Sequence, residues 1–328
     1  MDNKNYQQLT RTFLRLSRFS HLSAIASWDM FAMMPPGGSA ARGEALAELS
    51  VLEHQILTEP KVAQWLAAAA QEDLNDVEQA NLREMTRLHT QAALLPESLV
   101  EAKSLAGSRC EHAWRSQRPA NDWQGFSANL REVVKLSREE ARLRAEVKGC
   151  SPYDALLDIY EPEMTSAQLD GLFADLKSWL PDLLNRVVER QSQQPLLAPV
   201  GPFPTAVQRE LGLETMSALG FDFNAGRLDI SAHPFCGGVP EDVRITTRYD
   251  ENELLSALFG VIHETGHARY EQNLPRNWLG QPIALARSTA IHESQSLFFE
   301  MQVGRSNAFL QRLLPAVKRI MALSVNEA

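Results

Sequence analysis

Three residues in one short stretch, VIHETGHARY at positions 261–270, have the types and spacing for metal-assisted chemistry. His263 and His267 are four residues apart, so on a helix their imidazoles lie one turn apart on the same side. Two neutral imidazoles at this spacing can share one tetrahedral divalent cation. Glu264 is offset around the helix, where its carboxylate can take a proton from a cation-bound water and pass it to a leaving amine. The stretch therefore predicts a metal site with its own general base.

A match of this kind is uncommon by chance. Eight histidines among 328 residues give roughly 0.2 pairs at this spacing, and the added acidic residue lowers that to roughly 0.02. The alternative is a pair of surface or core histidines beside a solvated glutamate. The low chance frequency favours the metal site, and a third ligand elsewhere in the chain decides between the two interpretations.

The third ligand has to come from a second helix. In some metal sites a third histidine follows on the same segment, but no histidine follows His267 at the required spacing. Glu271 lies on the same face of the helix as the two histidines, and three ligands in a line along one helix cannot form a tetrahedral site. NLPRNWLGQP, residues 273–282, predicts a loop, after which helical spacing resumes in an antiparallel hairpin. From the rise of a helix, the part of the second helix that faces the two histidines lies about seven residues after its start, within one turn of Glu293. Glu300 lies roughly 10 Å farther along. Glu293 is the predicted third ligand.

The residues around Glu293 favour a cleft wall. Ser294, Gln295 and Ser296 are polar at positions where a buried helix would carry apolar side chains. His292 stands beside Glu293 and points to another side of the helix. Three roles are open to His292: support of the metal site, contact with substrate, or a satisfied polar group in the interior.

A short strand is predicted before the histidine helix. In EDVRITTRYD, residues 241–250, apolar and polar side chains alternate with a period of two. The apolar set is Val243, Ile245, Thr247 and Tyr249, and the polar set is Asp242, Arg244, Thr246 and Arg248. RLDISAHPF, residues 227–235, is the expected partner strand. The dense polar face either lines a site or forms a charged edge that resists aggregation.

Helical periodicity dominates the rest of the chain. A first helix ends at PPGG, residues 35–38, because proline and glycine cannot continue it. Further helices are expected at about 40–72, 76–94, 97–117, 123–147 and 166–192. A proline-rich loop, residues 192–206, separates an N-terminal helical part, 1–194, from a metal-binding part, 195–328, within one continuous domain. Asp250 followed by Glu253 is a capping-box pattern, which predicts that the histidine helix begins at about Glu251.

Composition narrows the choice of partners and compartment. The net charge of −9 and a pI near 5.5 leave no basic surface for nucleic acid or an anionic membrane. No apolar run reaches the roughly 18 residues of a membrane span, and the first ten residues have no apolar signal core. The three cysteines are too few and scattered for a disulfide framework, which suits a reducing cytosol. We expect a cytoplasmic protein without nucleic-acid or membrane partners.

Taken together, the motifs resemble those of a known family. HETGH followed by HESQS, with DVRIT upstream, is similar to the M32 metallocarboxypeptidases, the thermostable carboxypeptidase Taq family. SWDMFAMMP, YDALLDIYEPEMT and HPF, which begin at positions 27, 153 and 233, agree in the same order. The resemblance extends over nearly the whole chain.

The resemblance implies a fold, an activity and a set of residues. The fold would be mainly α: a saddle-like helical zincin with a deep groove and a small β-sheet beside the metal helix. The activity would be removal of single amino acids from the free C-termini of peptides, with broad side-chain preference, by a homodimer that uses Zn²⁺, with cobalt or another divalent metal as an alternative. The ligands would be His263, His267 and Glu293, with Glu264 as the general base that acts on a metal-bound water.

The resemblance also implies candidate substrate-binding residues. Asp242, Arg244 and Thr246 occupy the DxRxT positions that line the groove, where Arg244 would contact substrate or hold Asp242 in place. His233, from HPF, and His292 are further candidates.

Two family motifs, IRxxAD and GxxQDxHW, do not occur in this sequence. The resemblance therefore implies that the C-terminal third of the usual protein is missing, with apolar surface exposed on the helices that would pack against it. Three functions stay open. The favoured one is a zinc carboxypeptidase; the others are an aminopeptidase or endopeptidase of the same metal class, and a metal-binding remnant with little or no activity.

Overall fold

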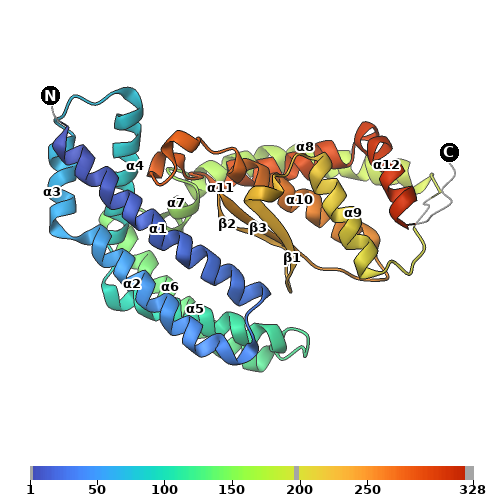
Figure 1. The fold of residues 1–328 in the computed structure, drawn as a ribbon, viewed down its shortest axis with the longest axis horizontal. Helices are drawn as coiled ribbons and strands as arrows, with labels where there is room; N and C mark the ends of the chain where they lie inside the picture. Colours follow the sequence, from blue (N-terminus) through green and yellow to red (C-terminus); the bar gives the residue numbers. More distant parts are fainter. Residues whose placement is uncertain (1–2, 196–198, 322–328) are drawn as a thin grey trace.

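The computed structural model describes residues 3–195 and 199–321 of the 328-residue chain. The chain is mainly helical with a small three-stranded sheet, which confirms the predicted fold class (Figure 1). Residues 196–198 of the predicted proline-rich loop lie outside the described residues. Within the described ranges, no helix combines the length and the apolar composition that a membrane span requires.

The N-terminal part is a set of packed helices. They are α1 Lys4–Ala32, α2 Ser39–Thr58, α3 Pro60–Ala69, α4 Asp76–Ala93, α5 Glu97–Gln117, α6 Trp123–Lys148, α7 Pro152–Tyr160 and α8 Ser166–Ser192. The single helix predicted over 40–72 is wrong, because it is two helices that meet at Pro60. Glu59 takes an extended backbone, and Pro60 is the first residue of α3, since proline disfavours a helical residue before it.

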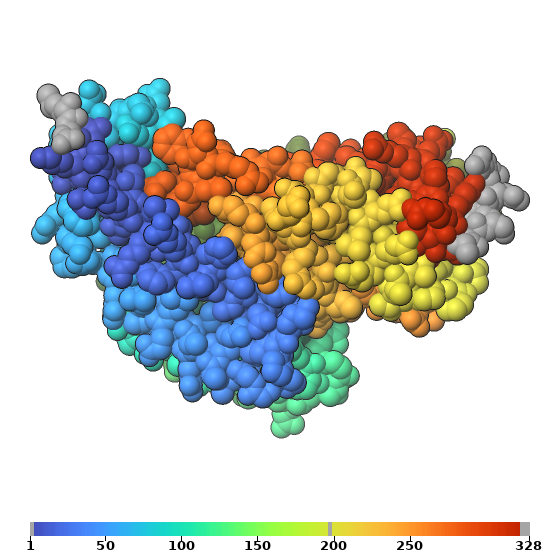
Figure 2. Space-filling view, viewed as in Figure 1, coloured from blue at the N-terminus to red at the C-terminus, as the bar shows by residue number. Residues whose placement is uncertain are grey.

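Apolar residues of α1 form the core of this part. They pack against residues of α3, α4 and the turn between them; the buried set is Tyr6, Leu9, Phe13, Leu16, Val62, Leu66, Ala69, Leu74, Leu82 and Met85. The spacing of three and four along α1 directs these side chains to one face. Near its C-terminal end α1 also contacts the strand β2 Phe235–Val239, where the ring centroids of Phe31 and Phe235 lie 5.5 Å apart. Figure 2 shows the N-terminal helices, in blue, packed against the orange and yellow C-terminal part.

The sheet has the order β1-β3-β2, with β1 Gly226–Ile230 parallel and β2 Phe235–Val239 antiparallel to β3 Asp242–Thr247. The predicted strand is confirmed over Asp242–Thr247. Its partner stretch, however, contributes to two strands instead of one, because the chain turns between Ile230 and Phe235. Gly238 has φ +87°, and a Cβ there would lie 2.1 Å from the carbonyl oxygen of Asp242, so the β2–β3 hairpin needs a glycine at this position.

The C-terminal part is built around one helix, α10 Leu254–Gln272. Its neighbours are α9 Thr205–Ala218, α11 Thr289–Leu297 and a π-helical turn Phe298–Gly304. The helix α12 Asn307–Met321 shares a hydrophobic cluster with it. One side of α10 packs Val261 on the sheet residues Val243 and Ile245. Another side packs Ile262 in a cluster that includes Leu211 of α9 and Leu313 of α12. The apolar contacts on several sides fix α10 at the centre of this part (Figure 1).

Two predicted helix starts are wrong. The histidine helix begins at Leu254, not at Glu251, because the Glu253 carboxylate itself accepts from the backbone N–H groups of Leu255 and Ser256. The next helix begins only at Thr289. Two short 3₁₀ turns, Arg276–Trp278 and Pro282–Ala284, extend the connection, and the Ser288 side chain caps α11.

The helix α8 carries exposed apolar surface. No residue of α8 is buried. The large apolar side chains exposed along it are Leu172, Phe173, Leu176, Trp179, Leu180, Leu183, Leu184, Val187 and Val188. A row of apolar residues at helical spacing normally packs against another element, and here it faces solvent.

Candidate metal centre

A glycine lets α10 and α11 approach closely enough for their side chains to meet. A Cβ at Gly266 would lie 2.6 Å from the Cα of Ser296 and 2.8 Å from the carbonyl oxygen of Gln295. Both are backbone atoms, so no side-chain movement could relieve the contact. The backbone of α11 therefore lies against α10 between the two histidine turns.

The three predicted ligands converge across this contact. The Nε2 atoms of His263 and His267 lie 3.8 and 3.2 Å from Oε2 of Glu293. One donor atom from each residue lies within 4.8 Å of the others, and this is the one such group of three among the described residues. Two imidazoles and one carboxylate form the donor set of zinc hydrolases that keep a fourth position open. The residues present therefore fit a divalent cation.

Burial sets the charge states of the site. Burial, followed by the nearby His292 and His263, lowers the pKa of His267 to about 4, so its ring is neutral and able to bind a cation. Glu264 is 6% exposed. Burial and the neighbouring Glu293 carboxylate raise the pKa of Glu264 to about 7, a value close to the best one for a group that accepts and returns protons at neutral pH.

Sequence reasoning missed a partner of His263. The Nδ1 atom of His263 lies 3.1 Å from Oε2 of Glu300, and Oε1 of Glu300 accepts from Arg305 at 2.7 Å. Glu300 is outside the donor set, as expected, but it holds the ring of a predicted ligand. Carboxylates commonly orient metal-binding histidines in this way. Glu300 lies in the π-helical turn. Positions in a π-helix do not follow the regular α-helical rise, so no signal in the sequence points to this contact.

Arg244 and Asp242 pair with each other. Arg244 donates from Nε and Nη2 to the two carboxylate oxygens of Asp242, at 2.9 and 2.7 Å. The hydrogen bonds from Arg244 lower the pKa of Asp242. The Arg244 guanidinium also lies 4.4 Å from the ring centroid of Trp28, and Arg227 lies 5.4 Å from the same ring. Of the two roles left open for Arg244, the structure displays the holding of Asp242, and it adds a contact with α1.

Thr246 and His233 lie in different surroundings. Thr246 is 0% exposed; its hydroxyl lies 2.7 Å from that of Ser231 and accepts from the backbone N–H of Phe235 at 3.1 Å. It therefore holds the start of β2 in place. His233 is exposed in the connection between β1 and β2. His292 lies beside His267, with ring centroids 4.7 Å apart.

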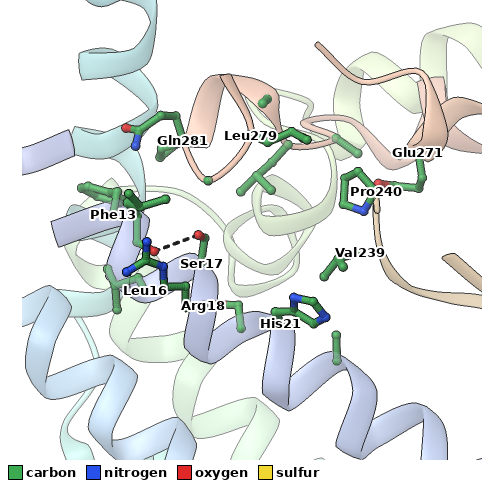
Figure 3. Close-up of a pocket in the computed structure, with 18 of the residues that line it drawn as sticks. Phe13, Leu16, Ser17, Arg18, His21, Val239, Pro240, Glu271, Leu279 and Gln281 are labelled. Atoms are coloured by element: carbon green, nitrogen blue, oxygen red, sulfur yellow. Dashed lines mark hydrogen bonds between the residues drawn. The ribbon is translucent and has the colours of Figure 1, made fainter. Parts of the chain in front are cut away.

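A cavity of about 870 Å³ borders this centre. Figure 3 shows Ser17, Arg18 and His21 of α1 facing Val239, Pro240 and Glu271, with Leu279 and Gln281 nearby. His292 is also part of its wall. The contribution of α1 could not be predicted, because its residues lie more than 200 positions from the metal helix and meet it only in the folded chain.

The histidine helix and the carboxylate of α11 define the class of metal-dependent hydrolases that use an HExxH helix. A sequence model of the carboxypeptidase Taq (M32) metallopeptidase family matches residues 8–327. The chain belongs to this family, as the resemblance of its motifs indicated.

Named relatives agree with this assignment. The chain is 38% identical to "Thermostable carboxypeptidase 1" of Thermus thermophilus and covers 64% of it, with 97% of this chain aligned. Among solved structures, "Trypanosoma Cruzi Metallocarboxypeptidase 1" is 46% identical with a TM-score of 0.88, over 98% of this chain and 66% of that chain. A Pyrococcus furiosus carboxypeptidase structure is 30% identical with a TM-score of 0.85, over 98% of this chain and 65% of that one. The chain thus spans slightly less than two thirds of the length of these relatives.

The close approach at Gly266 gives a first prediction. In Gly266→Ala, the methyl group would meet the backbone of α11 and push Glu293 away from the histidines. We expect the free energy of unfolding to fall by about 1–3 kcal/mol and zinc affinity to fall by roughly tenfold or more. Denaturant unfolding and zinc titration measure the two effects.

Gly107→Ala is the matched control, because Gly107 lies within α5 and a Cβ there has no atom within 4 Å. It should keep zinc affinity and leave stability equal or slightly higher, since alanine favours a helix. Equal zinc affinity and equal stability of the two variants would contradict the claim that the close backbone contact at Gly266 positions Glu293.

Proposed function

We propose that this chain carries the metal centre of a metal-dependent carboxypeptidase that removes single C-terminal amino acids with broad side-chain preference. The observation that carries the proposal is the convergence of His263, His267 and Glu293 beside the buried Glu264. Membership of a metallopeptidase family and relatives named carboxypeptidases support it. We propose zinc as the cation, since two imidazoles and one carboxylate suit it, with cobalt or another divalent metal as the alternative.

Each residue has a chemical role in this proposal. A bound divalent cation supplies a Lewis acid that polarises the substrate carbonyl and lowers the pKa of water. His263, His267 and Glu293 hold that cation. Glu264, as the general base, takes a proton from the attacking water and returns it to the leaving amine. Its raised pKa of about 7 suits both halves of this transfer.

The substrate-binding residues divide by their surroundings. We propose that the cavity between α1 and β2 receives the peptide, because its wall includes residues that adjoin the metal ligands. Asp242 and Arg244 do not line this cavity but directly follow its lining residues Gly237–Glu241, and their mutual ion pair keeps the start of β3 in place beside it. Thr246 is buried and keeps the start of β2 in place through the hydrogen bonds of its hydroxyl. His233 is exposed and stays a candidate for direct contact.

We also propose peptides with a free carboxyl terminus as substrates, a homodimer as the assembly and the cytoplasm as the location. The family resemblance supports these three proposals, and the three cysteines, too few and too scattered for a disulfide framework, further support the location.

Removal of the general base gives the second prediction. Glu264→Gln keeps the size of the side chain but cannot take a proton. We expect the variant to bind one zinc ion per chain and to lose roughly 10²- to 10⁴-fold in hydrolysis rate. Amino-acid release from the zinc-loaded chain measures the rate. Glu189→Gln, at an exposed position on α8, is the matched control and should leave the rate unchanged. Full activity in Glu264→Gln would exclude Glu264 as the base.

The form of the substrate terminus gives the third prediction. A peptide with a free carboxylate should be cleaved, and its C-terminal amide should be cleaved at least about 10²-fold more slowly, because a site built for a charged group rejects its neutral analogue. Mass spectrometry of the products measures this. Equal cleavage of both peptides would indicate an aminopeptidase or endopeptidase. Bound zinc with no release from either peptide would indicate a metal-binding remnant.

A further inference from the structure

A chain of three polar side chains leads from the cavity wall to a predicted metal ligand. Oε1 of Glu271 lies 2.7 Å from Nε2 of His292, and Nδ1 of His292 lies 2.6 Å from Nδ1 of His267. Glu271 and His267 are one turn apart on α10, whereas His292 comes from α11. The ring of Tyr270 packs against His292, with centroids 4.8 Å apart.

The positions of the protons follow from these distances. A carboxylate only accepts hydrogen bonds, so Nε2 of His292 carries the proton that faces Glu271. When this is the single proton of the ring, Nδ1 of His292 keeps a lone pair that can accept a hydrogen bond. Two nitrogens 2.6 Å apart need one proton between them, and that proton therefore belongs to Nδ1 of His267.

The same assignment determines what His267 presents to Glu293. With its proton on Nδ1, the ring directs the lone pair of Nε2 toward Oε2 of Glu293, 3.2 Å away. A lone pair and a carboxylate oxygen repel each other unless a cation lies between them. The tautomer set by His292 is thus the one that can bind a metal through Nε2.

Given the metal centre proposed above, we propose that His292 and Glu271 are positioning residues that hold His267 in its Nδ1–H tautomer, with Nε2 aimed at the cation. The two histidines of the centre are then held differently. His263 meets its carboxylate, Glu300, directly at 3.1 Å, whereas His267 reaches Glu271 through His292. Because His292 adjoins Glu293 on α11, the hydrogen bond that sets the tautomer also ties the third ligand to α10.

Two other roles of His292 are less well supported by these contacts. Both ring nitrogens are engaged, one with His267 and one with Glu271, so neither is free to bind a substrate. A histidine that only needed hydrogen-bond partners in the interior could pair with any polar group. His292 instead pairs with a predicted ligand, His267, at Nδ1, which is the ring nitrogen that does not face the cation.

Substitution of His292 tests this proposal. His292→Phe keeps an aromatic ring of similar size but accepts no hydrogen bond. We expect zinc affinity, measured by competition with a chelator, to fall roughly 10- to 100-fold. His292→Gln, whose carbonyl can accept from Nδ1 of His267, should recover part of this loss. His89→Phe, at a half-buried histidine of α4, is the matched control and should bind zinc as the unaltered chain does.

A spectroscopic readout separates positioning from general damage to the fold. In zinc-loaded chain, long-range ¹H–¹⁵N spectra should display His267 protonated at Nδ1 and His292 protonated at Nε2. The His267 Nδ1–H signal should exchange faster with water in His292→Phe while denaturant unfolding of the metal-free chain stays similar. Unaltered zinc affinity in His292→Phe, or His267 protonated at Nε2, would overturn the proposal. Failure of the unaltered chain to bind zinc would instead overturn the metal centre itself.

Discussion

The close contact between the backbones of α10 and α11 is the constraint on which the site depends. Gly266 has no side chain, so the Cα of Ser296 can lie 2.6 Å from the position that a Cβ would occupy. At this separation the Glu293 carboxylate lies 3.8 and 3.2 Å from the Nε2 atoms of the two imidazoles. Glu264 is buried in the same centre, where burial and the nearby Glu293 carboxylate raise its pKa to about 7.

The rest of the molecule keeps α10 in place and builds the cavity beside it. The sheet packs on one side of α10, and α9 and α12 pack on another. The ring of Trp28 lies within 4.4 Å of the Arg244 guanidinium and 5.4 Å of that of Arg227, which joins α1 to the strands by cation–π contacts. The helix α1 thereby supplies the cavity wall that faces Val239, Pro240 and Glu271 (Figure 3).

The sequence predicted the features that follow from regular helix geometry and missed those that do not. The spacing of the histidines and the rise of a helix placed Glu293 correctly beside them, although α11 begins later than expected. Glu300 was not linked to His263, because a π-helical turn changes the register. Thr246 occupies a position of the DxRxT motif, which suggested a groove residue, yet its hydroxyl is hydrogen-bonded inside the protein to the Ser231 hydroxyl and the Phe235 N–H. Such internal hydrogen bonds depend on distant segments that no local pattern specifies.

X-ray absorption spectroscopy of the chain loaded with one equivalent of zinc tests the central claim most directly. We predict a first shell with two imidazole nitrogens at roughly 2.0–2.1 Å and oxygen ligands at roughly 2.0–2.2 Å. A shell made only of water-like oxygens, or one that contains sulfur, would contradict a cation held by His263, His267 and Glu293.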